Sequence, residues 1–280
     1  MRFARRAANL PGLMLATARV LWSFRALLGT LISRELKARY RGSALGFLWS
    51  LLNPLLLLTV YAVVFGLVLT PPRGEDVKPY AVFLVSGLFP WIWFSSSVLE
   101  GAAAITQNSG LVRKAVFPAE LLPMVAVGSH LVHFFLALPI VAVALIVGRG
   151  LGFPVGGWGV LAVPFVIALQ LPFVAGLALG LSALTVHFKD VRDILANLLT
   201  LTFFATPIIY PLSAVPVPAI QTALRCNPVT PFALAYQEAL FAGRFPAPGL
   251  WLHMLAVALV AWAFGTWLFR RLRETVVEAL

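Results

Sequence analysis

Three residues of this chain could do chemistry within otherwise apolar stretches. His130 and His133 lie three residues apart in the sequence HLVH, and Glu100 is the one formal charge of another apolar stretch. Two histidines at this spacing share one face of a helix, where they could bind a metal ion or a haem. No cysteine or carboxylate stands beside them in the sequence, so we expect hydrogen bonds between helices rather than a metal site.

Glu100 has two possible roles. A carboxylate within a membrane-embedded segment is costly and usually faces a partner or water, so it indicates either a function or structural pairing. Only a few residues separate Glu100 from Gln107 and the polar loop that follows, so it could also lie near the mouth of a membrane domain. Both roles stay open for Glu100.

The sequence lacks the motif that would bind ATP. None of its lysines follows a glycine, so the phosphate-binding loop GxxxxGK[ST] is absent. No catalytic triad and no paired carboxylates for glycosyl chemistry are recognisable. The single cysteine, Cys226, can form no disulfide within the chain. We therefore predict that the chain is not an enzyme and that it carries no cofactor or metal ion.

The composition indicates that these residues lie in a membrane. Of the 280 residues, 61% are hydrophobic and only 11% are charged, whereas about 25% of a soluble domain is charged. Mean hydropathy is +0.94. The formal net charge is +11, but the basic residues lie beside long apolar runs. That pattern favours contact with membrane lipids and argues against nucleic-acid binding.

Six apolar stretches are long enough to cross a bilayer as helices, each residue adding about 1.5 Å. The sequence therefore predicts an all-α integral membrane protein. Pro54 falls inside the first stretch, where it is expected to kink the helix. The predicted spans cover residues 43–70, 80–107, 121–147, 158–186, 194–210 and 250–269.

The basic residues predict the orientation of the chain. With both termini in the cytoplasm, the inside segments hold 16 of the 21 basic residues, as is usual for cytoplasmic segments. We therefore expect a multi-pass protein of the inner (plasma) membrane. It would have a cytoplasmic N-terminal segment over 1–41, a transmembrane domain over 42–270 and a cytoplasmic tail over 271–280.

The segment before the first span is expected to form an amphipathic helix over residues 19–41. Most of its polar residues fall within a wedge of about 60° on a helix, and most of its apolar residues lie elsewhere. Such a helix would lie along the cytoplasmic leaflet. A basic flank that only sets the topology is the simpler alternative. The residues in the wedge are Arg19, Ser23, Thr30, Arg34, Lys37 and Arg41.

Aromatic residues surround Pro90 in the sequence GLFPWIWF. Phe89, Trp91, Trp93 and Phe94 lie near the outer end of the second predicted span. Taken alone, these residues favour a belt at the membrane interface. The alternative is a pore lining, because aromatic faces offer surfaces on which sugar rings can stack.

Five segments, in this order, carry a resemblance to a known family. Together they resemble the type-2 ABC exporter permeases for lipid-linked polysaccharides, which handle O-antigen, capsule and teichoic-acid polymers. The resemblance covers roughly residues 30–270, and it is the ordered set that is specific. The segments are RELKARYRGSALGFLWSLLNP (34–54), QNSGLVRKAVFPAELLP (107–123), HFKDVRDIL (187–195), TPIIYPLSAVP (206–216) and CNPVTPFALAYQEALFAGRFP (226–246).

The resemblance implies a homodimeric permease with two separate ATP-hydrolysing subunits, which would hold ATP and Mg²⁺. It implies a coupling helix that touches the ATPase, an interface helix beside it and short re-entrant gate helices over 211–246 at the outer face. Gln237 stands where many relatives carry arginine, so a charge-based role there is in doubt. The implied coupling residues are Asn108, Ser109, Leu111, Arg113, Lys114, Phe117, Arg34, Lys37 and Arg41. The implied substrate-channel residues are Tyr61, Trp91, Trp93, Phe94, Glu100 and Tyr210.

The sequence thus predicts the permease subunit of an ATP-driven exporter that moves a lipid-linked polysaccharide, such as O-antigen, across the inner membrane. One alternative is a type-2 ABC permease for drugs or lipids. Another is a membrane enzyme acting on a lipid-linked sugar, which should carry convergent acidic or nucleophilic residues. A secondary transporter should show an internal repeat, which we do not find.

Overall fold

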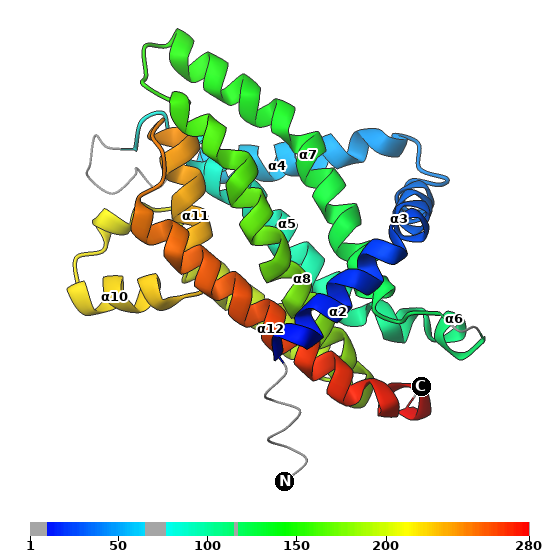
Figure 1. Cartoon of the computed structure of the whole chain (residues 1–280). Coiled ribbons are helices and arrows are strands. Elements are labelled where there is room, and N and C mark those ends of the chain that lie inside the picture. Colours follow the sequence, from blue (N-terminus) through cyan, green and yellow to red (C-terminus); the bar gives the residue numbers. More distant parts are fainter. Residues whose placement is uncertain (1–9, 65–76, 115–116, 280) are drawn as a thin grey trace.

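The computed structural model describes residues 10–64, 77–114 and 117–279, and every regular element within them is a helix (Figure 1). The predicted all-α class is confirmed for this part of the chain. The α-helices are α2 (Leu10–Ser23), α3 (Arg25–Arg39), α4 (Trp49–Val63), α5 (Tyr80–Gln107), α6 (Ser109–Lys114), α7 (Leu121–Gly150), α8 (Val163–His187), α9 (Val191–Phe204), α10 (Pro218–Cys226), α11 (Thr230–Tyr236) and α12 (Pro248–Ala279). Short 3-10 segments cover Gly46–Leu48, Trp158–Ala162 and Leu212–Ala214, and a π-helical turn covers Gln237–Phe241.

Among the described residues, four helices are long and apolar enough to cross a membrane, and they coincide with the second, third, fourth and sixth predicted spans. Two elements are shorter than the spans predicted for them, α4 with 15 residues and α9 with 14. Part of the first predicted span lies outside the described residues. The six-span count therefore stays a prediction. The four long helices are Tyr80–Gln107, Leu121–Gly150, Trp158–His187 and Pro248–Arg273.

The N-terminal segment is not the single helix that we expected over residues 19–41. It bends by 68° between α2 and α3, at Phe24, and the bent pair makes a fifth candidate for a span. The reason is that the two halves pack on different partners, α2 on α12 and α3 on α7. A straight helix could not contact both. The residues of α3 that are partly buried are its apolar ones, Leu28, Leu31, Ile32 and Leu36.

Helices α8 and α12 approach each other through small residues. A Cβ atom added at Gly265 of α12 would collide with the carbonyl oxygen of Gly176 of α8, and one added at Gly176 would collide with that of Ala261. Gly176 and Gly180 are four residues apart, as are Ala261 and Gly265, so each pair lies on one helix face. In a bilayer, such close backbone approach provides the dispersion contacts that hold helices together.

Helix α5 is the most buried of the four long helices and packs against α7 and α8. In Figure 1, α6 and the C-terminal end of α12 lie at one end of the bundle, and the loop between α7 and α8 lies at the other with α11. That loop is tied to the turn after α11, because Gly156 N–H donates to Leu240 O at 2.8 Å. Gly159 N–H donates to Gly243 O at 3.2 Å. The stretch 211–246 contains the short helices α10 and α11, and its role as a gate stays a prediction.

Candidate functional site

A groove of about 690 Å³ lies between α4, α5 and α9. Helix α5 forms one wall of the groove with residues spaced three or four apart, which places them on one helix face. The exposed rim includes Leu57, which is 38% exposed, and Phe204, which is 55% exposed. The groove is therefore open along one side. Its lining residues are Asn53, Pro54, Leu57 and Tyr61 of α4, Leu88, Trp91, Ile92, Ser95, Ser96 and Leu99 of α5, and Ala196, Leu199, Thr200, Phe203 and Phe204 of α9.

The chemistry of the groove is aromatic and uncharged. Phe203 contacts the three other aromatic rings of the lining, with centroid distances of 5.6 Å to Trp91, 5.7 Å to Tyr61 and 5.2 Å to Phe204. Ser95, Thr200 and Asn53 add hydroxyl and amide groups, and none of the described residues that line the groove is charged. Ring faces beside neutral hydrogen-bonding groups suit a polyhydroxylated, uncharged ligand.

Of the six residues predicted for the channel, Tyr61 and Trp91 line this groove. Trp93 stacks instead on Phe134 of α7, and Phe94 stacks on Phe173 of α8, each with ring centroids 5.4 Å apart. Both side chains are almost fully buried. Trp91 and Trp93 diverge because residues two apart on a helix do not share a face.

Two further aromatic residues lie in or beside the groove. Tyr210, the fifth predicted channel residue, donates its hydroxyl hydrogen to Phe204 O at 2.8 Å, at the rim of the groove. Phe203, which the sequence analysis missed, contributes the ring at the centre of the wall. Its stretch is apolar on nearly every side, so no hydrophobic periodicity marks the face that turns inward.

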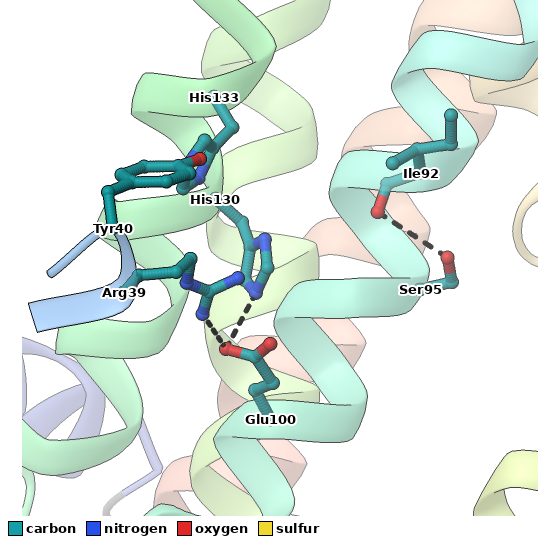
Figure 2. Close-up of polar contacts among 7 residues, drawn as sticks. All are labelled: Arg39, Tyr40, Ile92, Ser95, Glu100, His130 and His133. Atoms are coloured by element: carbon teal, nitrogen blue, oxygen red, sulfur yellow. Dashed lines mark hydrogen bonds and ion pairs between the residues drawn. The ribbon is translucent and has the colours of Figure 1, made fainter. Parts of the chain in front are cut away.

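The sixth predicted channel residue, Glu100, lies in a polar cluster where α3, α5 and α7 meet (Figure 2). Its Oε2 atom is 2.5 Å from Arg39 Nη2 and 2.8 Å from His130 Nε2. Tyr40 Oη lies 2.7 Å from His133 Nε2. Burial raises the pKa of Tyr40, so its hydroxyl stays protonated and can donate to His133. The hydrogen bonding between segments that was predicted for the HLVH pair is thus present at His133, while His130 makes a close contact with the Glu100 carboxylate without hydrogen-bond geometry.

The side chains of the cluster differ in exposure, from the surface of the protein toward its interior. The side chains of Arg39 and Glu100 are 30% and 42% exposed, while that of His130 is 9% exposed. A carboxylate at such a depth is stabilised by a cation at its open side and a histidine at its closed side. Within the described part of the chain, no group of three or more His, Cys, Asp or Glu residues could hold a metal ion.

The predicted coupling residues gather at the end of the bundle where α5 leads into α6. The Asn108 side chain donates to Ala104 O at 2.9 Å, and Asn108 O accepts from Leu111 N–H at 2.9 Å, which holds the turn between the two helices. Val112 is buried and Leu111 is 38% exposed. Helix α6 thus anchors through one apolar residue and presents another outward.

The remaining coupling residues are placed as follows. Arg34 lines a narrow cleft together with Asn108, so α3 and the start of α6 are adjacent. Arg34 and Lys37 of α3 line one groove together with Arg41, which lies two residues beyond the end of that helix. Ser109 and Phe117 are partly buried. Arg113 and Lys114 lie in α6, and their side chains are outside the described part of the structure.

Gln237, where the sequence departs from the family pattern, is buried. Its side-chain amide donates to Pro207 O at 2.6 Å, which ties the turn after α11 to the turn after α9. Position 237 therefore holds an uncharged side chain whose hydrogen bond joins two backbone segments.

A second ion pair joins the end of α12 to the start of α7. Glu120 Oε1 lies 2.9 Å from Arg273 Nη1, and the two side chains are 4% and 56% exposed. We expect Arg273→Ala to destabilise the protein by about 1–3 kcal/mol, because it leaves a buried carboxylate without its cation. Thermal unfolding of the purified protein measures this effect. Adding Glu120→Gln to Arg273→Ala should recover stability, and an unchanged unfolding temperature in Arg273→Ala would contradict the prediction.

The chain is similar to known membrane transport proteins over most of its length. Residues 26–241 match the family described as ABC-2 type transporter. An O-antigen export system permease protein, RfbA, of Myxococcus xanthus is 39% identical over 270 residues, which are 95% of this chain and 100% of that relative. RfbA of Klebsiella pneumoniae is 32% identical over 217 residues, or 78% of this chain and 81% of that relative. The polysialic acid transport protein KpsM of Escherichia coli is 27% identical over 253 residues, or 89% of this chain and 94% of that relative.

Proposed function

Because the chain belongs to the ABC-2 type transporter family, we propose that it is the membrane-spanning permease subunit of an ATP-driven exporter for a lipid-linked polysaccharide such as O-antigen. Relatives that match most of the chain are named for O-antigen export and for polysialic acid transport. The sequence contains no phosphate-binding loop. ATP and Mg²⁺ would therefore bind a separate ATPase subunit.

The groove between α4, α5 and α9 is the structural observation that supports a glycan as the substrate. A glycan presents hydroxyl groups along its edges and C–H groups on its ring faces. The Tyr61 and Trp91 rings supply surfaces for those ring faces, and Asn53 and Ser95 supply hydrogen-bonding partners. A volume of about 690 Å³ lies within the usual range for small-ligand sites, so the groove would hold a short section of a polymer.

The open side of the groove supports a homodimer. Exposed apolar side chains flank it, on α4 at Leu56 and Val60 and on α9 at Leu198 and Leu201. A second copy set against these two helices would close the groove into a channel. In this arrangement α4 and α9 complete the six predicted spans, both termini are cytoplasmic in the inner membrane, and the short helices of 211–246 gate the outer mouth.

The ATPase would dock at the end of the bundle that carries α6. The exposed Leu111, the start of α6 at Ser109 and the basic face of α3 support this placement. Arg113 and Lys114 add two formal charges to α6, which suits contact with a partner surface of opposite charge.

Co-purification tests the function directly. When the chain is co-expressed with a candidate ATPase subunit, we expect the two to purify together and the ATPase activity to rise on addition of a lipid-linked glycan. Arg113→Glu with Lys114→Glu should reduce ATPase recovery about tenfold at normal membrane insertion. Lys78→Glu, at the opposite end of α5, is the matched control and should not. Stimulation by drugs or simple lipids but not by the glycan would contradict the substrate class.

A further inference from the structure

The cluster of Arg39, Glu100 and His130 joins the N-terminal helix to the wall of the groove. Figure 2 shows Arg39 at the end of α3 and His130 on α7, both directed at the Glu100 carboxylate of α5. Glu100 lies about one turn beyond Ser96 on the same uninterrupted helix, and Ser96 lines the groove. A shift of the α5 backbone at Glu100 would therefore also move the part of α5 that lines the groove.

Helix α3 holds α5 and α7 in different ways. Along α7 it packs broadly, with Ile32 against Gly128 and Tyr40 bonded to His133. Toward α5 it reaches across with the Arg39 side chain, whose bond to Glu100 is an ion pair between two partly exposed groups. Such a pair is worth at most about 1 kcal/mol, so modest forces on α3 are enough to make or break it.

Glu100 has a second neighbour on its buried side. His130 Nε2 lies 2.8 Å from the same carboxylate oxygen that Arg39 contacts. If Arg39 withdrew, the carboxylate would still lie beside His130, so the triad offers two discrete arrangements. A transmission element needs two such arrangements.

We propose that the Arg39–Glu100–His130 triad couples the position of α3 to the α5 wall of the groove, so that movement of α3 by the ATPase changes the groove. Arg39 and His130 are positioning residues, because they act through Glu100 and α5 and do not line the groove. This inference rests on the proposed function, since the motion of the ATPase is its input.

The experiment compares ATP hydrolysed with polysaccharide exported in the full permease–ATPase complex. Glu100→Gln keeps the size of the side chain and removes its charge. Arg39→Gln leaves the Glu100–His130 contact in place, so it tests the same ion pair in a second variant that is expected to fold. In each variant we expect ATP hydrolysis within about twofold of wild type and export reduced about fivefold, the change to which about 1 kcal/mol corresponds. The number of ATP molecules hydrolysed per exported chain then rises about fivefold.

Two matched variants sharpen the result. Arg25→Gln removes another arginine of α3, one that contacts Trp22. In this variant the number of ATP molecules hydrolysed per exported chain should stay at the wild-type value. Arg39→Lys keeps the cation and should keep the ratio within about threefold of wild type. If Arg39→Lys were as uncoupled as Arg39→Gln, the ion pair would not be the link and the proposal would fail.

The remaining outcomes distinguish a coupling role of the triad from a purely structural one. A purely structural role would lower ATP hydrolysis and export together, leave their ratio unchanged and so overturn the proposal, as would normal export in Glu100→Gln. A wild-type complex that recovers no ATPase and exports no glycan would refute the proposed function, and the coupling role with it. The wild-type measurement thus separates the two failures.

Discussion

Trp91→Ala is expected to reduce polysaccharide export by about tenfold or more per folded protein. The Trp91 ring lines the groove beside Phe203. In proteins that bind single-stranded nucleic acid, stacking of a flat ligand on an aromatic ring is worth about 1–3 kcal/mol by alanine substitution. Each 1.4 kcal/mol corresponds to about a factor of ten. Export by purified complexes in proteoliposomes, normalised to folded permease, measures the effect.

The matched control is Trp93→Ala, two residues along the same helix. Trp93 is also buried, with 2% of its surface exposed against 8% for Trp91, but it stacks on Phe134 on the far side of α5. Truncating either tryptophan creates a cavity, which costs about 3–5 kcal/mol of stability in a typical core. Both variants should therefore yield less folded protein. Only the Trp91 variant should lose export per folded molecule. Equal losses in the two variants would show that packing, and not contact with the glycan, explains the effect.

Among the glycines that the structure describes, Gly265 is the one at which an added methyl group is expected to cost most stability, in the variant Gly265→Ala. The new Cβ would overlap the carbonyl oxygen of Gly176, and both atoms belong to helix backbones that cannot rotate out of the way. Helices α8 and α12 must then separate, which forfeits the dispersion contacts along their shared face. We expect a loss of about 3 kcal/mol or more, and most of the protein to elute as aggregate in size-exclusion chromatography.

Gly249→Ala on the same helix is the control for this prediction. Its Cβ would meet no atom within 4 Å, so the higher helix propensity of alanine should leave stability unchanged or raise it by up to about 1 kcal/mol. A Gly265→Ala variant that unfolds at the same temperature as Gly249→Ala would mean that the close approach of α8 and α12 does not hold the bundle together.

Long apolar runs made much of the fold predictable. The second predicted span, 80–107, coincides with α5 because Pro79 and the polar Gln107–Asn108 pair bound one continuous hydrophobic stretch. The bend at Phe24 could not be predicted, because no glycine or proline marks it. It arises from tertiary contacts, since α2 and α3 pack on different helices.

The site was predictable only in part. Helix geometry alone separates Trp91 from Trp93, so the sequence could have assigned them to different faces. The meeting of Glu100 with Arg39 and His130 joins residues 61 and 30 positions apart, and nothing local in the sequence specifies such a contact. Phe203 was missed for the same reason, because its role depends on α9 lying beside α4 and α5.

The small size of the groove has a consequence for polymer length. In the proposed dimer, each groove of about 690 Å³ holds only a short section of the glycan, so a strand far longer than the protein would advance through the channel repeat by repeat. The wall then meets only a few sugars at any moment and has no means of counting them. How long the finished strand becomes must be decided by the machinery that builds it.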